Sequence, residues 1–196
     1  MSVFLYCLTI YKSIMCLSMV NKFRNGIFSL RTRRFGSVAE IMIKKLYGYM
    51  YSGVLNYDLF DSSTNQRIEV KFATAIIKND QTIDETNIVS QCIQAEDVSK
   101  RVISSYAIAD TKFDCNIQQI KCKEFDIMYY GIFFFDCVQI FKITNQEVLT
   151  IPGYSNKQHR GNAGEGQFHI NNDTFSTHQK NLIKQLSYKE LYNLLK

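Results

Sequence analysis

Polar and apolar residues alternate through the segment RIEVKF at residues 67–72, and this feature limits the possible folds more than any other. A period of two places the three apolar side chains on one face of a β-strand and Glu69 and Lys71 on the opposite face. The turn-rich segment SSTNQ separates this strand from the stretch GVLNYDLFD. The sequence therefore predicts a β-hairpin that has Asp58 near the end of its first strand and a single apolar face.

A helix is predicted ahead of this hairpin. In the segment FGSVAEIMIKKLYGY, residues 35–49, apolar residues recur near helical spacing, which is typical of a short amphipathic helix. Ser37 is suited to cap the N-terminus of the helix, and Gly48 is suited to end it. Glu40 then lies in the first turns of the helix, ahead of the hairpin.

Further strands and helices are predicted downstream. Residues 125–143 are rich in aromatic and β-branched residues, which favours two buried strands joined near Asp136 or Gly131. The isoleucine and leucines near the C-terminus predict one or two terminal helical segments. Gln118 and Gln119 end a helical-looking stretch, and we interpret them as part of a helix surface.

Composition places the chain among folded, single-domain proteins. Its 196 residues are 46% hydrophobic with one proline, which excludes a disordered or low-complexity chain. At this length we expect a single domain over residues 26–196, preceded by an apolar extension of uncertain status at residues 1–25. Lys12 interrupts the apolar start and no cationic region precedes it, so we expect no stable membrane association.

The cysteines indicate the compartment. The chain has six cysteines with no CxxC pair and no regular spacing to its histidines, which argues against a zinc site or a disulfide framework. Reduced thiols are typical of the cytoplasm, or of a nuclear or viral setting in a eukaryotic host.

The charge distribution is uneven. The chain has 23 Lys and Arg against 18 Asp and Glu, and between Lys22 and Lys45 the only acid is Glu40. A mildly basic balance permits attraction to a polyanion without demonstrating it. The basic run formed by Arg31, Arg33 and Arg34 is either a solvated face or a set of phosphate contacts that position a duplex.

The predicted hairpin carries a set of residues suited to metal-dependent hydrolysis of a phosphodiester. Asp58 and Glu69 offer the hard oxygen ligands that Mg²⁺ prefers, with positions left for water and a phosphate oxygen. The ammonium of Lys71 is placed to orient or activate the water and to offset charge in the transition state. Glu40 is a candidate further metal ligand, or an acid that stabilises its own helix.

The order of Glu40 on a helix, then Asp58, then Glu69-Val70-Lys71 resembles the PD-(D/E)xK nuclease superfamily, and specifically small type II restriction endonucleases. The resemblance covers about residues 34–143. It implies an α/β fold with a restriction-endonuclease-like mixed central β-sheet flanked by helices, Mg²⁺ dependence and a homodimer. It also implies cleavage of double-stranded DNA at a short specific sequence. The chain departs from the motif because Tyr57 stands where the family has proline.

A long polar segment at residues 153–172 is predicted to be a functional loop. Amide and guanidinium groups form paired hydrogen bonds with adenine and guanine edges. The candidate base readers in this loop are Gln158, Arg160, Asn162 and Gln167. Two alternatives remain open: a glycine-rich loop without this task, and a metal site that uses His159 and His169.

Two other classes of protein remain possible from the sequence. The first is a non-catalytic nucleic-acid-binding or structural protein whose hairpin charges form surface pairs. The second is a membrane-associated protein that uses the apolar N-terminus. The endonuclease interpretation is preferred because Asp58, Glu69, Lys71 and Glu40 occur together in the expected order.

Overall fold

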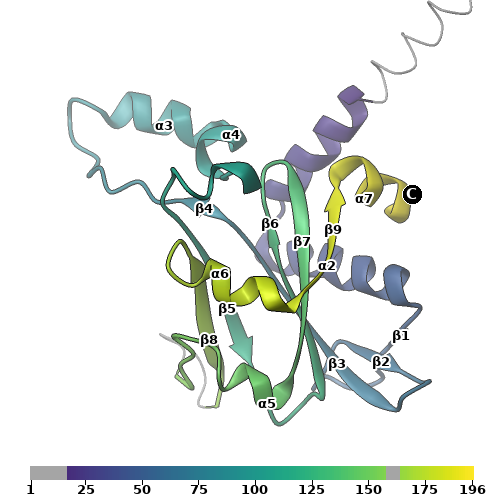
Figure 1. The fold of residues 1–196 in the computed structure, drawn as a ribbon. Helices are drawn as coiled ribbons and strands as arrows, with labels where there is room; N and C mark the ends of the chain where they lie inside the picture. The colour runs from purple at the N-terminus through teal and green to yellow at the C-terminus, as the bar shows by residue number, and fades with distance from the viewer. Residues whose placement is uncertain (1–16, 158–163) are drawn as a thin grey trace, which may run out of the picture.

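The computed structural model describes residues 17–157 and 164–196 as a mixed α/β fold (Figure 1). The strands are β1 (Met50–Tyr51), β2 (Leu59–Asp61), β3 (Gln66–Thr74), β4 (Ile76–Ile77), β5 (Phe113–Ile120), β6 (Ile127–Phe133), β7 (Cys137–Thr144), β8 (Gly166–Asn171) and β9 (Leu182–Ser187). The helices are 17–28, α2 (Thr32–Tyr47), α3 (Ile88–Glu96), α4 (Val98–Arg101), α5 (Asn145–Val148), α6 (Phe175–His178) and α7 (Tyr188–Leu195), with short 3₁₀ turns at Ser105–Ala107 and Gln179–Asn181.

The strands form two sheets. The larger has the order β1-β2-β3-β6-β7-β9, and the smaller has the order β4-β5-β8. In the larger sheet β3 and β6 run parallel, whereas the other neighbouring strands pair antiparallel. The predicted mixed central sheet flanked by helices is therefore confirmed, together with a second sheet that the sequence interpretation did not include.

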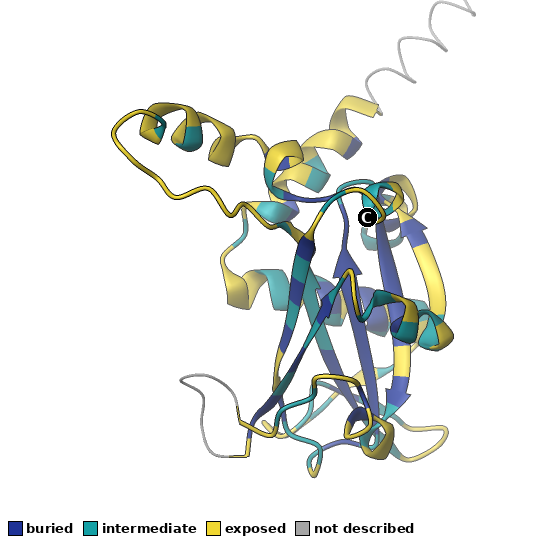
Figure 2. Cartoon of the chain, turned by 60° about the vertical axis from the view of Figure 1, so that its left-hand side comes forward, coloured by how far each residue is buried: buried dark blue, intermediate teal, exposed yellow. Residues whose placement is uncertain are grey.

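Two apolar layers explain why β6 is buried along its whole length and β7 along most of it; buried residues are dark blue in Figure 2. Alternate side chains of β6, such as Tyr129, face a layer with α2, α7 and helix 17–28. The intervening side chains, such as Tyr130, face the smaller sheet. A strand buried on both faces loses the polar alternation of a half-exposed strand.

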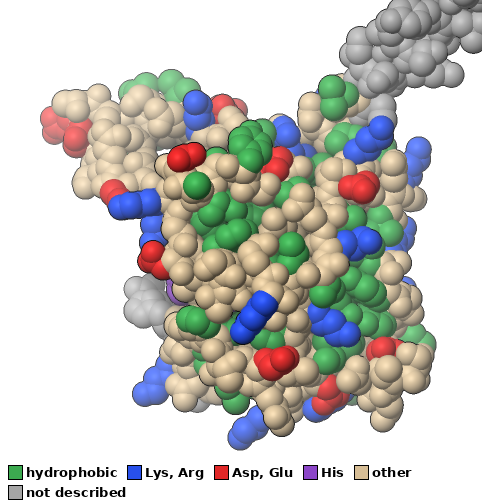
Figure 3. All heavy atoms as spheres, viewed as in Figure 1, with side chains coloured by type: hydrophobic (Ala, Val, Ile, Leu, Met, Phe, Trp, Pro, Cys, Tyr) green, Lys and Arg blue, Asp and Glu red, His purple; other side chains and the backbone are tan. Residues whose placement is uncertain are grey.

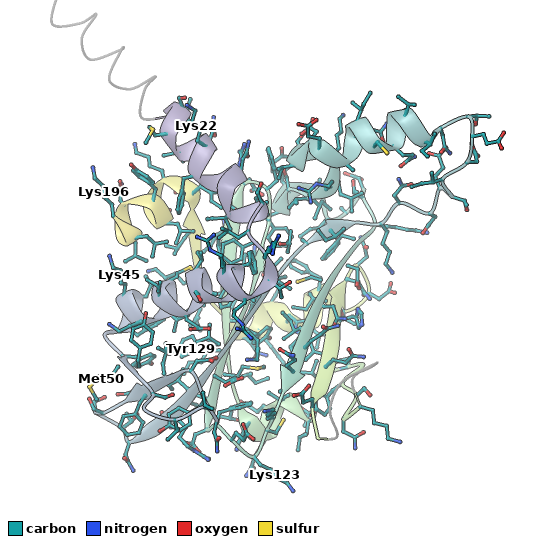
Figure 4. All side chains as sticks on the ribbon, turned by 180° about the vertical axis from the view of Figure 1, so that it is seen from behind. Lys22, Lys45, Met50, Lys123, Tyr129 and Lys196 are labelled. Atoms are coloured by element: carbon teal, nitrogen blue, oxygen red, sulfur yellow. The ribbon has the colours of Figure 1, made fainter. Side chains whose placement is uncertain are left out.

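Helix α2 packs against β3 and against α7 (Figure 4). Its last turn is joined to the C-terminus, because the ammonium of Lys45 donates to the carbonyls of Leu194 and Leu195. Gly48 ends the helix with φ at 74°, a left-handed conformation that glycine adopts without a steric cost, so this prediction is confirmed. The predicted N-cap is wrong: the helix begins at Thr32, and the Ser37 hydroxyl donates to the carbonyl of Arg33 within it.

The predicted hairpin is confirmed as β2 and β3, with Leu59 opposite Ile68. The turn is closed by Asp61, whose carboxylate accepts from the Ser63 N–H and from the hydroxyls of Ser63 and Thr64. Asp58 does not lie near the end of the first strand, because β2 begins one residue after it.

The connection between β6 and β7 lies at Asp136, one of the two positions predicted, and Gly131 is instead in the middle of β6. A Cβ at Gly131 would overlap the ring of Phe72 on the neighbouring strand β3 and lie 2.5 Å from the carbonyl of Gln139. The glycine is therefore required by close packing between strands and not by a turn.

Three further predictions are corrected. Gln118 and Gln119 lie on strand β5 and not on a helix. The polar segment 153–172 is not a loop throughout, since β8 occupies Gly166–Asn171. The C-terminal segment is helical only in part, because β9 lies between α6 and α7 and pairs with β7.

The N-terminal residues that the structure describes belong to helix 17–28, which places Val20 and Ile27 in the core. The boundary expected between residues 25 and 26 thus falls inside a helix. Among residues 17–157 and 164–196, we find no helix with the length and apolar character needed to span a bilayer.

Candidate functional site

The hairpin holds Asp58 against strand β3. The backbone N–H of Asp58 donates to the carbonyl of Ile68, and the backbone N–H of Val70 donates to Asp58 Oδ2 at 2.8 Å. Strand β2 pairs only with the first residues of β3. Beyond this pairing, the Asp58 carboxylate accepts the hydrogen bond from Val70 that a backbone carbonyl of a longer β2 would accept. The carboxylate is therefore fixed beside the point where the edge of β3 becomes open.

Glu69 and Lys71 lie on the same face of β3, as the alternation predicts. The Lys71 ammonium forms an ion pair with Glu69 Oε1 and lies 3.8 Å from Asp58 Oδ2. The structure thus brings Asp58, Glu69 and Lys71 together in one cluster, which we call the hairpin cluster. Glu69 is only 6% exposed, so the cluster places a carboxylate in a poorly hydrated position.

Burial dominates the acid–base properties of Glu69. Loss of hydration, reinforced by the negative charge of Asp58, raises the pKa of Glu69 to about 7, although Lys71 acts in the opposite direction. Burial alone would lower the pKa of Lys71, but the charges of Glu69, Asp58 and Glu40 outweigh it, and the net pKa is raised. Lys71 therefore keeps its proton at neutral pH, whereas Glu69 titrates there.

Glu40 approaches the hairpin cluster from the layer on the other face of β3. Burial raises the pKa of Glu40, as does the charge of Asp58. Within the described residues Glu40 forms no ion pair with Lys71, and no three His, Cys, Asp or Glu side chains gather closely enough to hold a metal ion. Glu40 is therefore not part of the hairpin cluster, although it lines the same groove as Lys71 and interacts electrostatically with Asp58 and Lys71.

Two solvent-open cavities meet at Lys71. The smaller, with a volume of about 220 Å³, contains the hairpin cluster and is lined beyond it by Gln119, Lys121, Glu124 and Glu165, among others. The larger, with a volume of about 620 Å³, runs along the open edge of β3 between α2 and β5, and we call it the groove. The groove has Arg33 and Glu40 on its α2 side and Asn116 and Gln118 on its β5 side.

The predicted DNA-binding residues are distributed unequally. Arg31, Arg33 and Arg34 are exposed at the start of α2, and Arg33 lines the groove. Gln167 is half-buried on β8. Gln158, Arg160 and Asn162 lie outside the described residues.

The alternative metal site is only half described, because His159 lies outside the described residues. His169 Nδ1 is 2.9 Å from Asp114 Oδ1, so its near neighbour is a carboxylate on the adjacent strand. This contact gives His169 a role on the surface of the smaller sheet, remote in register from the hairpin cluster.

Several residues beside the cluster were not predicted from the sequence. Lys121 and Glu124 line its cavity, and Glu165, 5% exposed, lies 4.0 Å from the Lys121 ammonium. The outward residues of β5 were not predicted either, although Phe113–Ile117 alternates as strictly as residues 67–72 do. This period of two in the sequence could have predicted strand β5 and its outward-facing residues.

On the face viewed in Figure 3, cationic and anionic side chains are interspersed. The hairpin cluster places two acids and a lysine together at the open edge of β3.

In comparisons with known proteins, no family model, curated protein or solved structure matches this chain.

Proposed function

We propose that this chain is a Mg²⁺-dependent endonuclease of the PD-(D/E)xK type that hydrolyses double-stranded DNA at a short specific sequence. The observation that carries the proposal is the hairpin cluster. Lys71 lies within ion-pair distance of both Asp58 and Glu69, and all three line one cavity that is open to solvent. A buried acid with a pKa near 7 beside a specific charge partner is typical of a functional site.

The donor set suits a hard divalent cation. Asp58 and Glu69 offer carboxylate oxygens, and Mg²⁺ completes its shell with water and substrate oxygens where few protein ligands are present. When bound there, the ion would supply a more acidic water and polarise the scissile phosphate. Glu40, on the far side of β3, would act on this site through its charge and not as a direct ligand.

Lys71 has a defined part in this proposal. Its raised pKa keeps the amine protonated at neutral pH, so it serves as a cation and not as a proton acceptor. Its present partner is the carboxylate of Glu69. When a cation takes that carboxylate, the ammonium would be free to face the phosphate and stabilise the negative charge of the transition state.

The groove is the proposed path for the duplex. Arg33 lines it, and Arg31 and Arg34 are exposed nearby on the same helix. These side chains would contact phosphates and position the duplex without reading its sequence. A second copy of the chain, bound as a homodimer, would place a second hairpin cluster on the other strand of a symmetric target.

Digestion of plasmid DNA tests the proposal. The purified chain should produce discrete fragments with Mg²⁺ and none with EDTA. Lys71→Met should abolish the fragments while binding of a duplex is retained. Asp61→Asn is the matched control, because this acid lies on the same hairpin and outside both cavities. Intact plasmid with the wild-type chain, or equal cutting by Lys71→Met, would refute the proposal.

A second function is favoured by one observation. Lys71 is already paired with both carboxylates, so the cluster also has the form of a closed structural ion pair. In that case the chain would bind nucleic acid without cutting it. The two functions differ in the same digestion, since a binding protein would shift the plasmid in a gel but leave it intact at every Mg²⁺ concentration.

A further inference from the structure

The smaller sheet has one apolar and one polar face. Strands β5 and β8 pair antiparallel, with Asn116 opposite His169 and Ile117 opposite Phe168. Phe113, Cys115, Ile117, Phe168 and Ile170 face the core and are almost completely buried. The intervening residues form the outward face, which we call the amide face: Asp114, Asn116 and Gln118 on β5, and Gln167, His169 and Asn171 on β8.

The amide face adjoins the candidate catalytic site. Asn116 and Gln118 line the groove together with Lys71 and Arg33, and strands β5 and β3 are in contact. The groove therefore has Arg33 and Glu40 on its α2 wall, Asn116 and Gln118 on its β5 wall, and Lys71 between the two walls. A duplex held by its phosphates on the first wall would present its base edges to the second.

A bulge shapes the end of β5 that lies nearest the hairpin cluster. The register of β5 and β8 shifts between Ile117 and Ile120, and Gln119 has φ at 60°, which is uncommon for a residue other than glycine. The bulge leaves both Gln118 and Gln119 exposed before Ile120 returns to the core. Strain of this kind is concentrated at functional sites.

Two side-chain carbonyl oxygens on this face lack a hydrogen-bond partner among the described residues. Asn116 Oδ1 and Gln167 Oε1 are shielded from solvent and accept no hydrogen bond from any described residue. Buried polar atoms are normally paired, and such exceptions mark strained or functional positions. A ligand that offers an N–H group next to an acceptor would satisfy these amides once they rotate, and the edge of adenine offers this pair.

The histidine on this face is oriented by its neighbour. Asp114, when ionised, can only accept, so His169 Nδ1 carries a proton and donates to this carboxylate. The side chain of His169 is 42% exposed. The six side chains of the amide face thus offer hydrogen-bond donors and acceptors and include no lysine or arginine, which suits base edges better than phosphates.

From these observations we propose that the amide face reads base edges in the major groove of duplex DNA, with Asn116, Gln118 and Gln167 determining the preferred sequence. The major groove of B-form DNA admits a two-stranded β-ribbon and distinguishes all four base pairs, whereas the minor groove mainly separates A·T from G·C pairs. The deep, narrow major groove of double-stranded RNA excludes such a ribbon. The inference rests on the proposed function, since it takes the duplex in the groove to be the substrate.

Selection of binding sites from a randomised duplex library, in Ca²⁺ without Mg²⁺, tests the inference apart from cleavage. The wild-type chain should enrich one short sequence. Gln118→Ala and Asn116→Ala should each weaken binding of that sequence about tenfold or more, and binding of random duplex less than about twofold. Arg33→Ala should instead weaken binding of all sequences and reduce the salt dependence.

Gln94→Ala is the matched control, since this exposed glutamine lies on α3 and outside the groove. Gln118 is exposed, so its truncation leaves the fold intact, and a thermal melt verifies this. Retained preference in both amide variants, or no enrichment by a wild-type chain that cuts plasmid, overturns the inference alone. Enrichment without cutting in Mg²⁺ overturns the nuclease proposal alone, and neither binding nor cutting overturns both.

Discussion

Two sets of charges on or beside strand β3 lie only a few residues apart, and they differ in burial and in the pKa of their carboxyl groups. Arg67 at the start of the strand forms a two-pronged ion pair with Asp126, and more than a third of each side chain is exposed. The hairpin cluster of Glu69, Lys71 and Asp58 is largely buried. The first set joins β3 to the residue before β6, and the second lies at an open strand edge.

The two environments shift the pKa of their carboxyl groups in opposite directions. Hydrogen bonds from Arg67 lower the pKa of Asp126, so the fold favours the ionised form. Burial raises the pKa of Glu69 to about 7 in spite of the adjacent lysine, so the fold disfavours the ionised form. This difference is what the proposed function requires, because a carboxyl group held near neutral pKa beside a lysine is typical of functional sites.

The largest expected effect is on the rate of plasmid cleavage, which should depend on the hairpin cluster and not on the ion pair between Arg67 and Asp126. Asp58→Asn and Glu69→Gln should each lower the rate of Mg²⁺-dependent plasmid cleavage about 10²- to 10³-fold, as removal of one preorganised charged group does in other active sites. Asp126→Asn should leave the rate within about twofold, because this acid lines neither cavity. Initial rates from a supercoiled substrate measure both. Equal losses in all three variants would remove the functional distinction.

The next effect is a dependence of stability on pH. The pKa of Glu69 is about 7 in the folded chain and near 4.5 when unfolded, so between these values the folded state binds more protons. The free energy of unfolding therefore falls as pH rises from about 4.5 to 7, by on the order of 3 kcal/mol. Urea unfolding at pH 5 and 7.5 should show this fall in the wild type and lose it in Glu69→Gln.

Asp126 affects the free energy of unfolding in the opposite direction, because its contribution to stability rises with pH instead of falling. Its lowered pKa stabilises the fold above its ordinary value, and this contribution disappears as pH falls below about 4. Asp126→Asn should therefore leave the fall between pH 4.5 and 7 unchanged. If Asp126→Asn alters that fall, or Glu69→Gln preserves it, the assignment of the pH dependence to Glu69 is wrong.

A smaller effect concerns the lysine alone. Lys71→Met removes the cation that faces two carboxylates and should lower the free energy of unfolding at pH 7.5 by about 1–3 kcal/mol. Glu69→Gln combined with Lys71→Met should restore most of that loss, since the double variant leaves fewer buried charges. Urea titrations of the single and double variants form a double-mutant cycle. An additive loss would mean that Lys71 and Glu69 do not interact.

The sequence was most informative where one local pattern sufficed. The period of two at residues 67–72 predicts both the hairpin and the shared face of Glu69 and Lys71, because side-chain direction in a strand depends only on the backbone. Gly48 ends α2 for an equally local reason. Gly131 was misread as a turn candidate because the contact that requires it, with Phe72, comes from a distant strand.

In the candidate site, too, local sequence patterns predict contacts within the hairpin but not contacts between distant elements. The approach of Asp58 to Lys71 follows from the hairpin register, which a short polar turn predicts. The position of Glu40 depends on which face of β3 is covered by α2, and no local pattern determines that. The strand β5 was assigned to a helix because its bulge at Gln119 breaks the alternation where the two glutamines follow each other.

The smallest expected effect concerns the ion pair between Arg67 and Asp126. Arg67→Met keeps the backbone N–H that donates to Asp126 Oδ2 and removes only the guanidinium bonds. Exposed ion pairs contribute about 0.2–1 kcal/mol, so the free energy of unfolding should fall by no more than this, and by less in high salt. Plasmid cleavage should be unchanged. If Arg67→Met abolishes cleavage, Arg67 and the hairpin cluster act as one site, and their separation into a structural and a chemical set fails.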